Sequence, residues 1–327
     1  MMAEPRVKVV YILGWVRSGS TLLDTLLGEL EGFFSCGELR YLWDRGLIKG
    51  WMCGCGSPLP QCEVWSRILE RAFEEGSPVP AREIARKHLN VVRTRRLPRV
   101  LYQSPGARFN WPELESYTET LQRLYLAIGE ATGSRVLVDS SKFAQDAALL
   151  RLLPAVDAYY VHLVRDPRAV AHSNLRKKTS QPDPLEPVEM ALWSPAQTAA
   201  RWSRFNLAAE AVRARHRRGA SIRLRYEDLI EHPAEALERI LRMLGEEHNG
   251  LAFVEDHVVE LNENHTVWGN PSRFRRGKVE LRLDDEWLDK LENRARLVST
   301  LVCAPLLLRY GYPIAGRKAS RNAEGKS

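Results

Sequence analysis

The sequence lacks any apolar run of the length needed to cross a membrane, and it begins without a basic and then apolar leader. We therefore expect no membrane span and a cytoplasmic protein. An acidic excess is also missing, since 48 Lys and Arg against 41 Asp and Glu give a net charge of +7. The basic residues are dispersed and form no aromatic–basic RNA motif, which argues against nucleic acid as a partner. A solvated basic surface and a polyanionic small ligand both fit the charge.

Cysteine is scarce, with five residues in a chain of 327. Cys53, Cys55 and Cys62 lie close together in the sequence, and Cys36 precedes them. A zinc site needs four ligands at recognisable spacing, and this spacing is a poor match. A metal site and a local disulfide stay open as alternatives, but free structural thiols are the preferred interpretation.

Internal repeats are absent too, and strand-like and helix-like segments alternate. We expect strands at 7–13, 33–36, 135–139, 158–164 and 221–226. We expect helices at 20–31, 113–132, 142–153, 167–177, 189–217, 234–244 and 284–309. The alternation predicts an α/β protein with a P-loop-type three-layer fold, in which helices flank a central, mostly parallel sheet of about five strands.

The domain organisation follows from composition. We expect one domain over residues 1–313, in which 44–132 form an insertion of helices and loops. Residues 178–200 should form a lid loop, since 178–188 are rich in proline. The small, polar and basic residues 314–327 are typical of a disordered tail.

One motif lacks a single residue. Residues 14–21 read Gly-Trp-Val-Arg-Ser-Gly-Ser-Thr, directly after an apolar run. This is the frame of a phosphate-binding loop, G-x-x-x-x-G-K-[ST], with Ser20 in place of the lysine. Backbone N–H groups of such a loop cradle a phosphate, but the lysine that reaches the β- and γ-phosphates of a nucleoside triphosphate is missing. We therefore expect a nucleotide-like anion other than ATP or GTP.

Polar residues follow the expected strands, and in a parallel sheet they would meet at one edge. Glu38 follows the second strand and Lys142 the third. Arg165 ends the fourth strand, and Ser173 lies about two turns along the next helix. An arginine reaches about that far, so the two side chains could hold one phosphate. An Arg paired with a nearby acid and a Ser facing solvent explain the same segment without a ligand.

In this order, the motifs resemble those of the sulfotransferases that use 3′-phosphoadenosine 5′-phosphosulfate (PAPS). The loop 14–21 resembles their 5′-phosphosulfate loop, and Arg165 and Ser173 match their 3′-phosphate motif. The segment 225–229, Arg-Tyr-Glu-Asp-Leu, and the segment 272–278, Ser-Arg-Phe-Arg-Arg-Gly-Lys, resemble two later motifs. Cys36-Gly-Glu38 and Lys142 resemble positions of the bacterial and tyrosylprotein-type members.

The resemblance implies a role for each position. Glu38 would be the catalytic base, with Arg17 and Lys142 stabilising the developing charge. The implied cofactor contacts are Arg17, Ser18, Gly19, Ser20, Thr21, Arg165, Ser173, Tyr226, Arg275, Arg276 and Gly277. No metal is needed for this chemistry. The chain departs from the cytosolic small-molecule enzymes, which use a histidine base and a lysine in the first loop.

The expected function is in-line transfer of a sulfuryl group from PAPS to the hydroxyl of a small molecule or natural-product intermediate, releasing 3′-phosphoadenosine 5′-phosphate (PAP). A P-loop kinase or hydrolase is one alternative, and a non-catalytic nucleotide-binding protein is another. The sequence defines neither the acceptor nor the oligomeric state. His265 lies in a polar loop before the last motif, where contact with substrate or cofactor is one hypothesis. His162 alternates inward in a strand and is expected to be a core residue.

Overall fold

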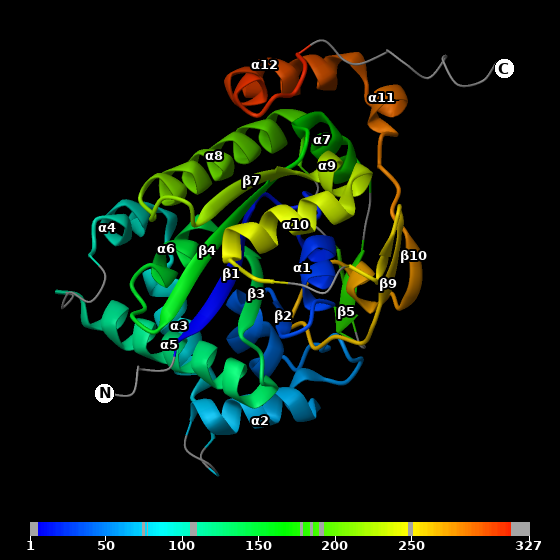
Figure 1. The fold of residues 1–327 in the computed structure, drawn as a ribbon. Coiled ribbons are helices and arrows are strands. Elements are labelled where there is room, and N and C mark those ends of the chain that lie inside the picture. Colours follow the sequence, from blue (N-terminus) through cyan, green and yellow to red (C-terminus); the bar gives the residue numbers. More distant parts are fainter. Residues whose placement is uncertain are drawn as a thin grey trace.

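The computed structural model describes residues 6–73, 76, 78–104, 110–176, 179–183, 186–189, 193–247 and 251–314 (Figure 1). The expected tail lies outside these residues beyond Ile314. Among the helices in the described ranges, none is long and apolar enough to span a bilayer.

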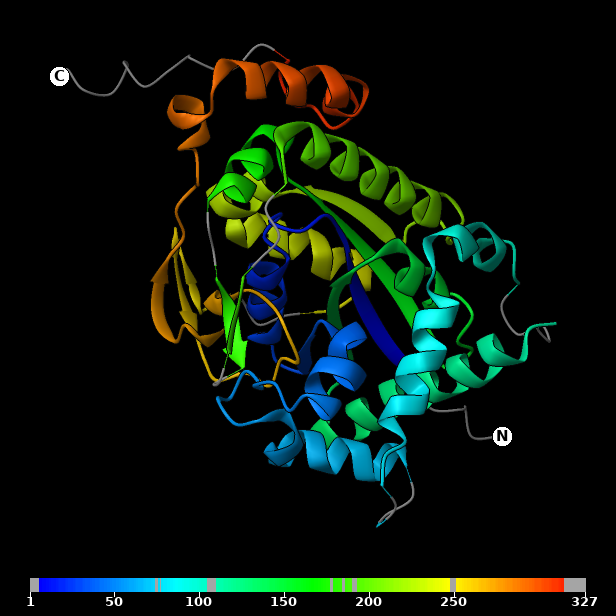
Figure 2. The same ribbon diagram turned by 180° about the vertical axis from the view of Figure 1, so that it is seen from behind.

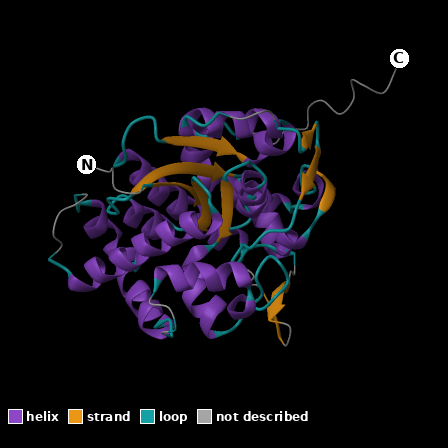
Figure 3. Cartoon of the chain, turned by 60° about the horizontal axis from the view of Figure 1, so that its bottom comes forward, coloured by secondary structure: helices purple, strands orange, loops and turns teal. Residues whose placement is uncertain are grey.

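Five parallel strands form the central sheet in the order β2-β3-β1-β4-β7, with β1 in the middle (Figures 1 and 3). They are β1 Val7–Gly14, β2 Phe33–Gly37, β3 Val136–Lys142, β4 Val156–Val164 and β7 Ser221–Arg225. Each corresponds to one of the expected strands, so the predicted α/β fold class is confirmed. Because all five run the same way, their carboxyl ends meet at one edge of the sheet.

Helices cover both faces of this sheet, because apolar side chains of β1 point alternately to one face and to the other. Val9, Tyr11 and Leu13 pack into the cluster that includes the insertion and α5, Pro112–Thr132. The intervening residues Val10 and Ile12 pack against leucines of α1, Ser20–Gly28, and α10, Pro233–Leu244. Figure 1 shows α1 and α10 in front of the sheet, and Figure 2 shows the insertion helices from the opposite side. The core therefore consists of two apolar layers, one on each face.

Several helices begin or end at other residues than the sequence predicts. Besides α10, the described α-helices after β3 are α6 Ala144–Leu150, α7 Pro167–Leu175, α8 Pro195–Ala214, α9 Tyr226–Glu231, α11 Trp287–Lys290 and α12 Asn293–Arg309. Helix α8 begins late because Ser194 and Gln197 form a capping box with Pro195 at the first position. The helix expected over 284–309 is split at Leu291, and Arg296 Nη2 donates to Leu288 O at the end of α11.

The insertion is more helical than its composition suggests. Besides α5, it holds α2 Glu63–Ala72, α3 Ala81–Val91 and α4 Leu97–Leu101, together with the short helices η3 Leu59–Gln61 and η4 Thr94–Arg96. The short helix η1 Leu39–Tyr41 precedes it, and η2 Leu42–Ile48 leads into it. Side chains of this segment, among them Leu59 and Trp65, are buried in the same cluster as β1. Helix α2 packs against α5, and its buried residues Trp65, Ile68 and Leu69 lie on one face at helical spacing.

Two small antiparallel sheets were not predicted. The first contains β8 Val254–Glu255, β9 Val258–Leu261 and β10 Gly277–Glu280. The second pairs β5 Thr179–Asp183 with β6 Glu186–Glu189, within the segment expected to be an irregular Pro-rich loop. A two-stranded ladder tolerates proline because each strand has an unpaired edge. The 262–276 loop, which includes η5 Pro271–Phe274, connects β9 to β10.

A buried carboxyl group lies between α1 and β2. The Ser35 hydroxyl donates to Asp24 Oδ2 at 2.5 Å, and Asp24 is 1% exposed. Burial raises the pKa of Asp24 to about 8. In the folded protein Asp24 therefore keeps a proton that it releases at about pH 4 in the unfolded chain.

We expect this proton to make the folded state less stable as the pH rises. Between about pH 4 and pH 8 the folded state binds more protons than the unfolded state, so the free energy of unfolding falls by up to about 1.4 kcal/mol per pH unit. Asp24→Asn should flatten this decline, which urea unfolding of both proteins at mildly acidic and mildly alkaline pH would measure. An equal decline in the two proteins would contradict the assignment.

Candidate active site

A cavity of about 660 Å³ opens at the carboxyl edge of the sheet. A volume of this size suits a small ligand or cofactor. The sequence-predicted residues that line it are Arg17, Gly19, Ser20, Thr21, Glu38, Lys142, Arg165, Tyr226 and Arg275. They come from the first four strand ends of the sheet, from α9 and from the 262–276 loop, so the fold brings together residues that are far apart in sequence.

Four predicted cofactor contacts lie elsewhere. Ser18 and Ser173 are each 1% exposed and do not line the cavity, whereas Asn174, the neighbour of Ser173, does. Arg276 Nη1 instead donates to Glu263 Oε2 at 2.7 Å. Gly277 begins β10, where it pairs with Leu261.

The phosphate-type loop connects β1 to α1 and depends on Gly19. This residue has φ of 87°, and a Cβ atom there would lie 2.4 Å from the ring of Tyr226. Thr21 follows in the first turn of α1, and its Oγ1 accepts a hydrogen bond of 3.0 Å from Asn270 N. The N-terminus of α1 therefore faces the cavity with backbone N–H groups that favour an anion.

Glu38 and Lys142 form a buried ion pair at the ends of β2 and β3. Lys142 Nζ lies 2.5 Å from Glu38 Oε1, and both side chains are 7% exposed. Lys142 has φ of 72°, a strained conformation for a residue with a side chain. Such strain is frequent at functional sites, and here it accompanies a buried pair on the cavity wall.

Gly37 permits the 262–276 loop to approach the backbone next to Glu38. Val267 N donates to Cys36 O at 2.9 Å, and a Cβ atom on Gly37 would lie 2.8 Å from Thr266 Cβ. Gly37 also has φ of 70°. The glycine of the Cys36-Gly-Glu38 segment therefore has a structural reason, because a larger residue would push the loop away.

Three guanidinium groups gather at the end of β4. Arg165 Nη1 donates to Arg17 O at 3.0 Å, and Arg165 lies over the Tyr226 ring. Arg176, which also lines the cavity, pairs with Asp284 Oδ2 at 2.5 Å, and Arg165 Nη2 lies 3.2 Å from the same oxygen. Burial, with the charges of Arg176 and Arg165, lowers the pKa of Arg17. This part of the cavity is therefore strongly cationic.

The Asp284 carboxylate is held by that cationic cluster. Burial would raise the pKa of Asp284, but Arg165 and Arg176 outweigh burial and lower it. Sequence reasoning missed Asp284, because it lies in a segment expected to be helical. It also missed Arg176. This residue follows Ser173 by three positions in the helix expected over 167–177, so helical spacing already placed it on the same side as Ser173.

Aromatic rings form the opposite wall. Trp15 packs on Phe205 with ring centroids 4.2 Å apart and on Trp193 at 5.4 Å. Phe143, next to Lys142, packs on Phe205 at 5.3 Å. Trp15, Phe143, Trp193 and Phe205 all line this cavity.

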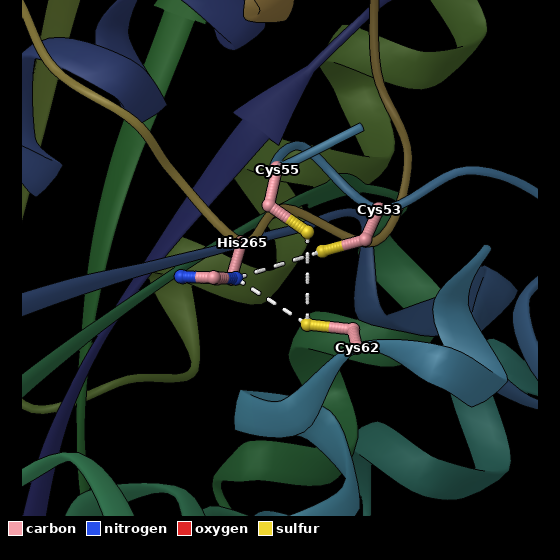
Figure 4. Close-up of side chains that lie close together, drawn as sticks. All are labelled: Cys53, Cys55, Cys62 and His265. Atoms are coloured by element: carbon pink, nitrogen blue, oxygen red, sulfur yellow. Dashed lines mark hydrogen bonds between the residues drawn. The ribbon is translucent and has the colours of Figure 1, made fainter. Parts of the chain in front are cut away.

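The two histidines that the sequence singled out lie away from the cavity. His162 is 0% exposed and hydrogen-bonded to Asn206 Oδ1, consistent with a core residue. His265 does not line the cavity, and its Nδ1 lies 3.3 Å from Cys62 Sγ (Figure 4). A direct contact of His265 with substrate or cofactor therefore finds no support in the geometry.

Comparisons with known proteins identify the family. Residues 10–250 match the model of a family described as the sulfotransferase family. A match over more than half of the chain shows that this protein belongs to the sulfotransferase family and is a sulfotransferase, an enzyme that transfers sulfuryl groups. The resemblance to PAPS-dependent sulfotransferases is thus confirmed, and a kinase or a non-catalytic protein is disfavoured. No curated protein sequence gives a significant match.

Solved structures share the fold. A sulfotransferase domain from the curacin biosynthetic pathway is 17% identical, with a TM-score of 0.55, and the alignment covers 94% of this chain and 99% of that one. The sulfotransferase domain of the Synechococcus PCC 7002 olefin synthase is 20% identical, with a TM-score of 0.51 and coverage of 96% and 98%. At these identities the likeness shows the fold alone.

We expect Gly19→Ala to lower the melting temperature, because the methyl group meets Tyr226 and a left-handed residue other than glycine costs about 1 to 2 kcal/mol. In a Tyr226→Ala background the added loss should be smaller, because only the backbone strain remains. Thermal unfolding of the four proteins in this cycle measures both contributions. A loss of equal size in both backgrounds would show that the ring contact does not constrain the loop.

Proposed function

We propose that the protein transfers the sulfuryl group of PAPS to a hydroxyl group of a small-molecule acceptor, with Glu38 as the base. The observation that carries this proposal is the buried Glu38–Lys142 pair on the wall of a cavity that also holds a phosphate-type loop. A carboxylate to accept a proton and a cation to stabilise a leaving oxygen are the groups that this reaction needs.

The phosphate-type loop would hold the 5′ end of the donor. Backbone N–H groups of residues 19–21, at the N-terminus of α1, offer an anion site to the 5′-phosphate. PAPS has one phosphate between adenosine and sulfate, so no γ-phosphate requires a lysine at Ser20. Arg17, which lines the cavity, supplies positive charge at the same end.

The cationic cluster would hold the 3′-phosphate. Arg165 and Arg176 already bind a carboxylate, Asp284, and a phosphate group with more charge would compete for them. Arg275 lines the cavity from the 262–276 loop, and Tyr226 lies beside Arg165. Asn174, rather than Ser173, is the residue of α7 in position to add a hydrogen bond.

The reaction would proceed in line. The acceptor oxygen forms a bond to sulfur while the bond between sulfur and the bridging oxygen of the 5′-phosphate breaks, and PAP leaves. Glu38 takes the acceptor proton, because its carboxylate is the form that pairs with Lys142. Lys142 and Arg17 offset the negative charge that develops on the bridging oxygen and the sulfonate. Arginine and lysine side chains thus supply the charge neutralisation that phosphoryl transfer draws from metal ions.

The acceptor pocket would be aromatic. Trp15, Phe143, Trp193 and Phe205 line the cavity beside Lys142, and rings of this kind favour an apolar or aromatic body. Trp15 Nε1 is buried without a hydrogen-bond partner among the described residues.

Removing the base should separate binding from chemistry. We expect Glu38→Gln to retain PAP affinity and to lower kcat by about 100- to 10,000-fold, because a positioned base contributes that much. Isothermal titration with PAP and turnover with labelled PAPS measure the two effects. Glu31→Gln, at an exposed carboxylate before β2, is the matched control and should keep wild-type turnover. Wild-type turnover in Glu38→Gln would remove Glu38 from the mechanism.

Arg165 should recognise the 3′-phosphate specifically. We expect Arg165→Lys to weaken PAP binding by about 10- to 100-fold, the loss of a charged bidentate contact, and to leave adenosine 5′-phosphate binding nearly unchanged. Arg282→Lys, at an exposed arginine on the cavity rim, should change neither affinity. Equal weakening of both nucleotides by Arg165→Lys would show that Arg165 only supports the loop.

A further inference from the structure

Three cysteines and one histidine converge outside the active-site cavity. The ligand atoms of Cys53, Cys55, Cys62 and His265 all lie within 4.8 Å of one another (Figure 4). The cysteines come from the turn and short helix before α2, whereas His265 comes from the 262–276 loop, about two hundred residues later. None of the four lines the cavity, and the established transfer reaction uses none of them.

The spacing of these atoms matches the edges of a tetrahedron. Zinc lies about 2.3 Å from thiolate sulfur and about 2.0 Å from imidazole nitrogen, which sets edges of about 3.8 Å between sulfurs and about 3.5 Å between sulfur and nitrogen. In the structure, Cys55 Sγ lies 3.8 Å from Cys62 Sγ. His265 Nδ1 lies 3.3 Å from Cys62 Sγ and 3.9 Å from Cys53 Sγ. The other three edges are 4.8 Å or shorter, so the four atoms lie close enough together to share one ion.

We propose that Cys53, Cys55, Cys62 and His265 bind one zinc ion in a closed structural site. Three sulfurs and one nitrogen are the soft donors that tetrahedral zinc prefers, and four protein ligands leave no position for substrate. The sequence favoured free thiols because the cysteine spacing offers only three ligands. The fourth comes from a remote loop, and only the fold shows it.

The surroundings suit a site of this charge. Zinc with three thiolates and a neutral imidazole carries a net charge of −1, and cationic side chains lie next to its ligands. Arg276 Nη2 lies 3.4 Å from both Gly54 O and Cys55 O, and the buried Arg273 donates to Met52 O at 2.7 Å. Trp65 Nε1 donates to His265 O at 2.7 Å, which fixes the histidine backbone. Partners of this kind orient metal ligands.

The ion would join the insertion to the loop that covers the active site. Downstream of His265, the loop contacts Cys36 O through Val267 N and Thr21 Oγ1 through Asn270 N. It then supplies Arg275 to the cavity wall. The zinc site would therefore fix one end of a segment whose other contacts lie beside Glu38 and the phosphate-type loop.

Metal content tests this proposal directly. The full chain without a polyhistidine tag, purified from zinc-supplemented cells and dialysed, should contain about one zinc per molecule by elemental analysis. Cobalt in its place should give the thiolate charge-transfer bands and intense d–d bands of a tetrahedral site. A metal-free protein would overturn the proposal, whether its five cysteines titrate as thiols or two of them form a disulfide.

Matched variants identify the ligands. We expect His265→Ala to lose most of the zinc and to unfold at lower temperature, and His265→Cys to keep about one zinc per chain, because a fourth thiolate completes the tetrahedron. Cys303→Ala, which removes a buried thiol far from the cluster, should also keep it. Full zinc content in His265→Ala would overturn the ligand assignment. These readouts do not depend on activity, so they stand apart from any failure of the proposed transfer reaction.

Discussion

The buried Glu38–Lys142 pair is the interaction on which the active-site edge depends. Two opposite charges inside a protein are tolerated only when they lie in contact, and here they lie 2.5 Å apart. This contact requires the ends of β2 and β3 to lie side by side. It coincides with the left-handed conformations at Gly37 and Lys142 and with the irregular register between β1 and β3 near Leu13. Next to the pair, the Ser141 hydroxyl accepts from Arg40 N and donates to Asp139, so the backbone on both sides is fixed by hydrogen bonds.

The sheet and the strand-end residues could be predicted because their signals are local. Each strand is a short apolar run with a polar end, and parallel pairing then places Arg17, Glu38, Lys142 and Arg165 at one edge. Helices α2 and α3 of the insertion were missed, although neither contains Gly or Pro and the buried residues of each recur at helical spacing. The Gly, Pro and Cys residues that precede α2 drew attention to loops instead. The last expected helix is split at Leu291, and Arg296 of the following helix donates to Leu288 O across the break.

The rest of the site escaped prediction because it arises from contacts between distant segments. Asp284 acquires its importance only from the guanidinium groups of Arg165 and Arg176. Contact of His265 with substrate or cofactor was a hypothesis based on its neighbours in sequence, whereas its neighbours in space are sulfur atoms. Ser173 and Arg276 carry the motif but do not line the cavity, whereas Asn174 and Arg275 do. In this protein, the motifs identify the helix turn or loop that lies near the cavity. They do not identify which residue of that turn or loop lines it.

If the cationic cluster binds the 3′-phosphate as proposed, the Asp284 carboxylate has a kinetic consequence. The carboxylate pairs with Arg165 and Arg176 before any nucleotide is bound, so a phosphate that binds there exchanges one anion for another. Such an exchange lowers the net affinity for every nucleotide that carries a 3′-phosphate, and so for both PAPS and PAP. The enzyme would thus release PAP without leaving the guanidinium groups of Arg165 and Arg176 unpaired and poorly solvated. A built-in counter-anion of this kind favours rapid turnover over tight retention of the product.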